Sequence, residues 1–140
     1  MVHRIMGAAV AAILVAGCAR HSATAPSGAG YLTLKAGEHG EVNGIAVTMV
    51  RVDADSRCPS DVQCVSAGNA VVAFTLRTPS DPLGSGTAAL QFLNTTVEPR
   101  SLVRAGYRIT LDSLTPYPVS THTIAPDEYR AFFSVAFLPD

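Results

Sequence analysis

The sequence predicts an all-β domain, either an antiparallel β-sandwich or a small Greek-key barrel of six to eight short strands, with one disulfide-pinned loop. Three observations lead to this prediction. After residue 30, apolar side chains alternate with polar or small ones in short runs, which is the period of a β-strand. Segments rich in glycine and proline separate these runs. No window after the N-terminal segment keeps the 3.6-residue period of an amphipathic helix.

The N-terminal segment has the layout of an export signal. His3 and Arg4 precede an apolar run from Ile5 to Ala16, and a run of about 12 residues is too short to cross a bilayer as a helix. The run ends in Leu14-Val15-Ala16-Gly17-Cys18, which resembles the lipobox of bacterial lipoproteins. Residues 1–17 are therefore expected to be a lipoprotein signal peptide. The alternatives are an ordinary signal peptide with a chance cysteine, or a core helix.

The lipobox resemblance implies a membrane anchor. In that family the cysteine is diacylated on sulfur, with chains such as palmitate, and becomes the N-terminus after cleavage, so Cys18 is the expected lipidation site. Two or three acyl chains suffice for stable anchoring to a bilayer. By the same resemblance, Ala19 favours the outer membrane facing the periplasm over the inner membrane, because an aspartate there would favour inner-membrane retention.

Residues 18–30 are expected to form a flexible tether because they carry no large apolar side chain before Tyr31. His21 lies in this stretch without metal-ligating neighbours. Residues 31–140 then form a single β domain. The whole chain has a formal net charge of −1, and the basic residues of the domain are scattered along the sequence. Nucleic acid is therefore not an expected partner.

The first half of the domain reads as two strands. Tyr31–Leu34 is the first, and Lys35–Gly40 should be a turn because it contains two glycines. Residues 45–52 form the second strand, in which the apolar phase slips by one residue after Met49. Such a slip predicts a β-bulge near Met49–Val50, with two short strands or a strand buried on both faces as alternatives.

The second half reads as four strands with irregular connections. The strands are expected around residues 70–77, 90–92, 107–112 and 133–137, with a further short strand possible at 96–97. Residues 78–87 and 94–99 should be a loop and a turn, and residues 114–126 should be extended but irregular because of three prolines. The strand phases predict this buried set: Val47, Val72, Phe74, Leu76, Leu90, Phe92, Tyr107, Ile109, Leu111, Phe133, Val135 and Phe137.

The remaining two cysteines lie in the loop between residues 53 and 68. If Cys18 carries lipid, Cys58 and Cys64 form an even pair in an oxidising compartment and are expected to be disulfide-bonded. In the same loop Arg57 should pair with a nearby carboxylate, and Asp55 and Ser56 should accept backbone N–H groups.

Three chemical alternatives for this loop stay open. Redox catalysis is disfavoured because five residues separate the cysteines, whereas such sites use C-x-x-C. A metal site would combine Cys58 and Cys64 with His39 and His122, but the spacing does not match known zinc motifs. A calcium site would use Asp53, Asp55 and Asp61, although the loop lacks the glycine and glutamate of an EF-hand.

A broader resemblance runs over most of the domain. The segments Asp55-Ser56-Arg57-Cys58-Pro59 and Cys64 to Ala70, the stretch from Gly106 to Pro116, and Asp127-x-Tyr129-x-Ala131 resemble a family of small bacterial lipoproteins and secreted all-β domains with a DSRCP…C…AG loop. The resemblance implies a disulfide-pinned β domain and supplies no catalytic residues. The family has tryptophan at the position of Ser66.

These observations favour a membrane-anchored lipoprotein whose β domain binds a protein partner or an envelope component without catalysis. No catalytic, cofactor-binding or metal-binding residue is assigned, because no recognised motif frames a nucleophile or a ligand set. One alternative is a small envelope hydrolase or metal-dependent enzyme that uses His39 or His122. Another is a protease-inhibitor-like domain that presents the Cys58–Cys64 loop.

Overall fold

The structure is a computed structural model that describes residues 28–79 and 89–138, and within these ranges the fold is all-β. Its described residues contain eight strands and no helix. The strands are β1 (Gly30–Leu34), β2 (His39–Val42), β3 (Ile45–Asp55), β4 (Ala70–Arg77), β5 (Leu90–Asn94), β6 (Ser101–Arg104), β7 (Tyr107–Thr115) and β8 (Arg130–Phe137). No helix that could cross a bilayer occurs in this part of the chain.

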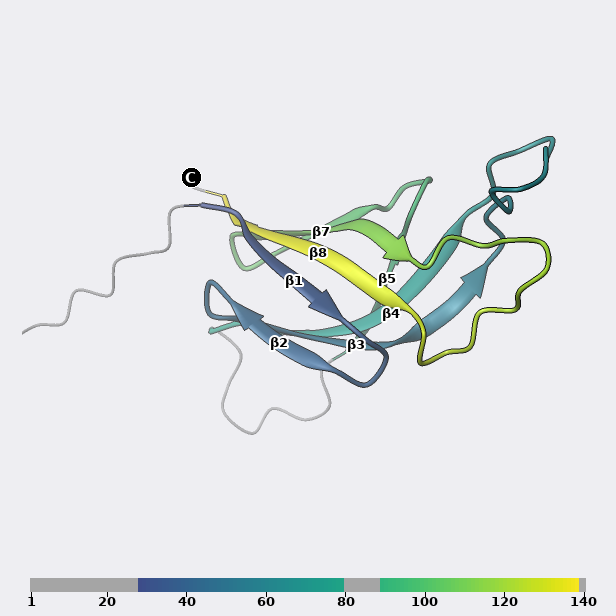
Figure 1. Cartoon of the computed structure of the whole chain (residues 1–140). Coiled ribbons are helices and arrows are strands. Elements are labelled where there is room, and N and C mark those ends of the chain that lie inside the picture. The colour runs from purple at the N-terminus through teal and green to yellow at the C-terminus, as the bar shows by residue number, and fades with distance from the viewer. Residues whose placement is uncertain (1–27, 80–88, 139–140) are drawn as a thin grey trace, which may run out of the picture.

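The strands form two antiparallel four-stranded sheets, with the orders β1-β8-β7-β6 and β2-β3-β4-β5. The two sheets are separate and open, which is the arrangement of a sandwich rather than of a closed barrel (Figure 1). The predicted all-β fold is therefore confirmed, and of the two predicted architectures the sandwich is the one adopted.

Two tight hairpins set the register of the sheets. Asn43 and Gly44 connect β2 to β3, and Ala105 and Gly106 connect β6 to β7. All four residues have positive φ angles, between 51° and 76°, as two-residue type I′ turns require. Strands β2 and β6, which these turns follow, differ from the prediction, which has His39 and Gly40 in a turn and no strand at residues 101–104.

The predicted bulge in β3 is present. The pairing of β3 with β4 shifts register between Met49 and Arg51, so Val50 is the extra residue. A second shift follows between Val52 and Ala54. Each bulge adds twist and bend to the strand, so β3 leaves the plane of its sheet as it approaches the cysteine loop.

The core lies between the facing sheets. Phe74 of β4 and Phe133 of β8 are both fully buried, and their ring centroids are 5.6 Å apart. Offset aromatic pairs at this distance are favourable beyond the burial of their area. The remaining members of the predicted set that are fully or almost fully buried are Val47, Val72, Leu76, Ile109, Leu111 and Val135.

The predicted phase of β5 was wrong. Leu90 and Phe92 are 37% and 44% exposed, whereas Leu93 is buried. Pairing explains the difference, because Leu93 lies opposite the inward-facing Val72 while Phe92 lies opposite Ala73 on the outer face. The alternation of Leu90 and Phe92 around Gln91 thus marked the outer face of an edge strand.

Three smaller corrections concern chain ends and turns. Phe137 is 39% exposed because it lies at the rim of the sandwich, where its ring packs edge-on against Tyr107, itself only partly buried. Residues 96–97 form part of a turn and not a strand. Strand β7 continues to Thr115, so the irregular segment begins later than predicted, and the predicted loop at 78–87 lies mostly outside the described residues.

The chain enters the domain at one end of the sandwich and forms the cysteine loop at the other (Figure 1). The side-chain amide of Asn43, in the β2–β3 turn, donates to the carbonyl oxygens of Gly28 and Val135, each at 3.1 Å. At Gly30 a Cβ would come 1.9 Å from the Val42 side chain, so glycine lets β1 approach β2 closely. Between Ala46 and Asp55, β3 follows the eight residues of β4 toward the cysteine loop, a length of about 23 Å at roughly 3.3 Å per residue.

The opposite burial of two phenylalanines gives a matched test of the fold. Phe74→Ala should lower the free energy of unfolding by about 3–5 kcal/mol, because it empties a buried site. Phe92→Ala removes a ring that is nearly half exposed and should cost less than about 1.5 kcal/mol. Urea unfolding of the full chain measures both values. Equal costs for the two variants would contradict the assigned phase of β5.

Candidate functional site

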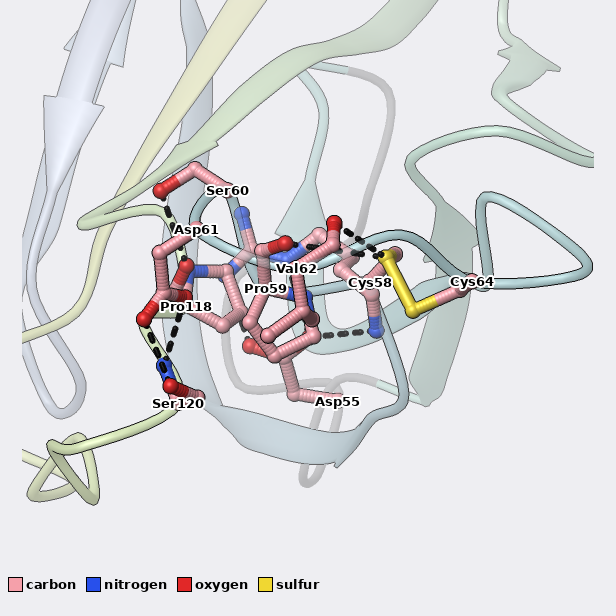
Figure 2. The surroundings of a disulfide bond; sticks show 10 residues. Asp55, Cys58, Pro59, Ser60, Asp61, Val62, Cys64, Pro118 and Ser120 are labelled. Atoms are coloured by element: carbon pink, nitrogen blue, oxygen red, sulfur yellow. Dashed lines mark hydrogen bonds and ion pairs between the residues drawn. A yellow bond between two sulfur atoms is a disulfide. The ribbon is translucent and has the colours of Figure 1, made fainter.

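The loop between β3 and β4 is closed by the expected disulfide. Cys58 and Cys64 are bonded, with their Cα atoms 5.9 Å apart (Figure 2). The ring also contains a turn, in which the Val62 N–H donates to the carbonyl oxygen of Pro59 at 3.3 Å. Because both sulfurs are consumed by this bond, the loop offers neither a free thiol for redox chemistry nor a thiolate for a metal.

Arg57, just before the ring, is the anchor of the loop. Only 6% of its surface is exposed, and its guanidinium makes a two-pronged ion pair with Asp55, with N–O distances of 2.8 Å and 2.6 Å. The same group donates to the carbonyl oxygens of Leu114 at 2.6 Å and Pro116 at 3.0 Å. One face of the guanidinium lies 5.0 Å from the ring centre of Tyr117. The predicted carboxylate partner is thus Asp55, and the carbonyl partners come from β7 and the segment after it.

Asp55 is the matching acceptor of this cluster. Besides the guanidinium, it accepts the backbone N–H of Arg57 at 3.2 Å and the hydroxyl of Tyr129 at 3.0 Å. Burial raises the pKa of Asp55, but hydrogen bonds and charge from Arg57 outweigh burial, so the net pKa is lowered. Burial, together with the hydrogen bond to Asp55, raises the pKa of Tyr129 to about 12. Near neutral pH the cluster therefore holds one carboxylate, one guanidinium and one neutral phenol.

A second set of contacts holds the outer side of the ring. The Ser60 N–H donates to the carbonyl oxygen of Pro118 at 2.9 Å. The carboxylate of Asp61 accepts the backbone N–H of Ser120 at 2.8 Å and its hydroxyl at 2.5 Å (Figure 2). The hydroxyl and N–H of Ser120 lower the pKa of Asp61 below its usual value. The segment after β7 therefore braces the loop at two separate places.

The return arm of the loop is joined to its outgoing arm by backbone hydrogen bonds. The Cys58 N–H donates to the Ala67 carbonyl at 2.8 Å, and the Ser56 N–H donates to the Asn69 carbonyl at 2.7 Å. Gly68 lies between them with a φ of +69°. A Cβ at Gly68 would lie 1.8 Å from the carbonyl oxygen of Ser56, so only glycine fits there.

Asn69 connects the loop to the turn between β5 and β6. Its side-chain oxygen accepts the backbone N–H groups of Thr95 and Thr96, each at 3.1 Å. Its side-chain NH₂ donates to the side-chain oxygen of Asn94 at 2.8 Å. The Thr96 hydroxyl in turn donates to the Gly68 carbonyl at 2.7 Å. The role of Asn69 was not predicted. The only local feature of the sequence that points to it is the position of Asn69 between a glycine and the first residue of a strand.

An open hollow of about 410 Å³ lies between these two loops. Its lining residues are Ser56, Ser66, Ala67, Gly68, Asn69, Thr96 and Val97. Val65 is fully exposed beside it, and Val97 is more than half exposed on its other side. Ser66, the position at which the resembled family has tryptophan, lies in this hollow and is exposed.

The histidines do not meet a nucleophile in the part of the chain that the structure describes. The Nε2 atom of His122 lies 3.3 Å from Glu128, and both side chains are exposed. The nearby Ser120 hydroxyl is donated to Asp61 instead of to a histidine. His39 lies in β2, at the far side of the sheet order from β5, and pairs with Thr48. Among the described residues, no hydrogen bond joins a serine hydroxyl to His39 or His122.

The three aspartates considered for calcium are each used separately. Asp53 pairs with Arg51 at 2.8 Å, Asp55 pairs with Arg57, and Asp61 holds Ser120. Residues 28–79 and 89–138 hold no group of three or more histidine, cysteine, aspartate or glutamate side chains placed to bind a metal. The proposed lipidation site, Cys18, and His21 both lie outside the described residues.

Comparison of the chain with protein-family models, with curated proteins and with solved structures finds no match. The case for a function therefore depends on the geometry of the loop and on the sequence of the N-terminal segment.

The anchoring role of Arg57 can be measured against a matched exposed pair. Arg57→Met should cost about 3–5 kcal/mol of folding free energy, because it removes the guanidinium from the buried Asp55 carboxylate, whose side chain is 10% exposed, and from the carbonyl oxygens of Leu114 and Pro116. Arg51→Met breaks an ion pair of the same sequence spacing, with Asp53, that is about half exposed, and should cost about 1 kcal/mol or less. Chemical denaturation of both variants measures the difference, and similar small costs would show that Arg57 is not an anchor.

Proposed function

We propose that the chain is a lipid-anchored lipoprotein of the bacterial cell envelope, and that its β domain binds a protein partner through the end that carries the Cys58–Cys64 loop. In this proposal Cys18 carries the lipid, residues 19–27 connect the lipid to the domain, and the outer membrane facing the periplasm is the favoured location. The lipobox resemblance and the export-type N-terminal segment support the anchor.

One observation carries the binding role: the disulfide loop projects from the sandwich at the end opposite to the chain entry (Figure 1). Three sets of side-chain contacts brace it there. Arg57 holds its base, Asp61 holds its outer side, and Asn69 holds its return arm. At the same time Val62 and Val65 are exposed. A rigid loop that displays apolar side chains to water has the properties of a binding surface, since little conformational entropy is lost when a partner docks.

The geometry supports binding over catalysis. Arg57 of the loop pairs with Asp55, Asp61 accepts the Ser120 hydroxyl, and His122 contacts Glu128, so none of these contacts sets a nucleophile beside a base. The hollow lined in part by Arg57, His122 and Tyr129, about 310 Å³, is open to solvent. Its most buried charged group, Arg57, already makes four side-chain hydrogen bonds, two to Asp55 and two to carbonyl oxygens.

A protease-inhibitor role fits less well. Inhibitors that mimic a substrate present an extended segment, because the protease pairs with it as with a β-strand. Here the chain bends at Val65 and Ser66, immediately after the disulfide. A general protein-binding loop needs no extended segment, so binding of a partner is the better-supported role.

The anchor is tested by replacing its cysteine. Cys18→Ser should move the protein from the membrane fraction to the soluble fraction of the envelope and should block lipoprotein-type processing of the precursor. Metabolic labelling with a palmitate analogue should mark the wild type alone. Membrane association and processing that are unchanged in the variant would contradict the lipoprotein proposal.

The binding role is tested in the same cells by formaldehyde cross-linking of the wild-type protein. A discrete adduct should form, and the double substitution Val62→Asp and Val65→Asp should reduce it. An adduct insensitive to these substitutions would move the binding surface elsewhere on the domain. The absence of any adduct in wild-type cells would contradict the binding role itself.

A further inference from the structure

The hollow between the disulfide loop and the β5–β6 turn is lined only by uncharged residues. We propose that it is a docking pocket for an uncharged apolar side chain of a partner protein that approaches from the side of the domain facing away from the membrane. This inference rests on the proposed function and specifies where its partner binds. Figure 2 shows the Cys58–Cys64 disulfide, and the arm of the loop that follows Cys64 leads to this hollow.

The walls of the hollow are preorganised. Gly68 is fixed by its left-handed backbone and by the close carbonyl of Ser56. Asn69 and Thr96 bind each other across the floor, with the Thr96 N–H 3.1 Å from the Asn69 side-chain oxygen. The disulfide fixes the position from which the chain returns through Val65. A side chain entering the hollow therefore meets a shape that exists before binding, which lowers the entropic cost of docking.

The chemistry of the lining selects an uncharged guest. None of the seven lining residues carries a charge. Their main polar groups already bond to one another: the Ser56 hydroxyl contacts the Asn69 backbone at 3.0 Å and 3.2 Å, and the Thr96 hydroxyl donates to Gly68. What remains for a ligand is the carbon surface of Ala67 and Val97, the exposed Ser66 and, beside the hollow, the exposed Val65. Burying a charged guest here would cost solvation without a compensating partner.

The position of the hollow identifies the guest as part of another protein. The described chain starts at Gly28, which is held at the far end of the sandwich by Asn43. The ten residues from Cys18 to Ser27 span at most about 35 Å when fully extended. The paired length of β3 and β4 is about 23 Å, and the loop extends beyond it. The root-mean-square span of a ten-residue segment, about 17 Å, falls short of this distance, so the N-terminal segment is not the expected guest.

The same lengths favour a protein over the lipid bilayer as the guest. To turn the loop end toward the anchoring membrane, the connecting segment would have to stretch well beyond its root-mean-square span of about 17 Å along the side of the domain. The loop end thus faces away from the lipid, toward proteins of the compartment into which the domain extends.

Small probes test the pocket independently of the partner. The full-length lipidated protein, labelled with ¹⁵N and held in lipid nanodiscs, is titrated with N-acetyl-leucinamide and N-acetyl-phenylalaninamide. The charged control is the α-amide of N-acetyl-aspartic acid, which keeps its side-chain carboxylate. We expect saturable amide shifts confined to residues 66–69 and 95–97, with a Kd on the order of millimolar, and none with the control. No saturable shift, or equal shifts with the charged probe, would overturn the pocket.

Site-specific cross-linking tests the pocket in cells. Benzoylphenylalanine is placed at Val65, beside the hollow, and at the exposed positions Tyr31 and Val103 on other strands. A discrete adduct should form from Val65, and Ser66→Asp should reduce it about tenfold because a charge then occupies the hollow. Gln63→Asp, which adds the same charge to the loop outside the hollow, should leave the adduct unchanged.

The outcomes separate this inference from the proposed function. An adduct from Tyr31 or Val103 but not from Val65 would overturn the pocket while leaving a binding domain. An adduct from Val65 that resists Ser66→Asp would also overturn the pocket. Absence of adducts from all three positions would contradict both proposals. Thermal unfolding of the Asp variants confirms that the fold is intact in each comparison.

Discussion

The buried pair of Arg57 and Asp55 is the interaction on which the loop end of this protein depends. It joins the end of β3 to Leu114 and Pro116 and, through Asp55, to Tyr129. The expected free energies show why this ion pair contributes more to stability than the disulfide does. Closing a ring of this size stabilises by about 2 kcal/mol on the loop-entropy model, whereas breaking a buried pair by removing one partner costs about 3–5 kcal/mol. The disulfide stiffens the loop, and the ion pair determines where the stiff loop lies.

This division of roles connects the fold to the proposed binding function. A loop with exposed Val62 and Val65 would lose much of its binding energy to ordering if it were mobile. Here the ordering is already provided by folding, through Arg57 at the base, Asp61 on the outer side and Asn69 on the return arm. Arg57, Asp61 and Asn69 use their side chains in this bracing, while Val62 and Val65 remain exposed as the apolar surface of the proposed binding site.

Features with a local cause could be predicted from the sequence. The slip of the apolar period at Met49 predicted the bulge in β3, and the cysteine pair predicted the disulfide. The edge strand β5 was assigned the wrong phase, because large apolar residues on an exposed face imitate an inward pattern and only pairing with β4 shows that Leu93 faces the core. Asn43-Gly44 is a strong hairpin signal that would have revealed β2. The partners of Arg57 at Leu114 and Pro116 were beyond prediction, since such contacts depend on how the two sheets meet.

Native-state hydrogen exchange of the full-length protein tests most directly whether the loop end is a rigid, prefolded surface. The account predicts that the amide protons of Ser56, Cys58, Thr95 and Thr96, which donate within the braced loop and its neighbouring turn, exchange at least about a hundredfold more slowly than in an unfolded chain. The amide of Val65, exposed at the bend beside the hollow, should exchange quickly. Exchange of Ser56 and Cys58 as fast as that of Val65 would contradict the account, because the loop would then be mobile and no preformed surface would exist.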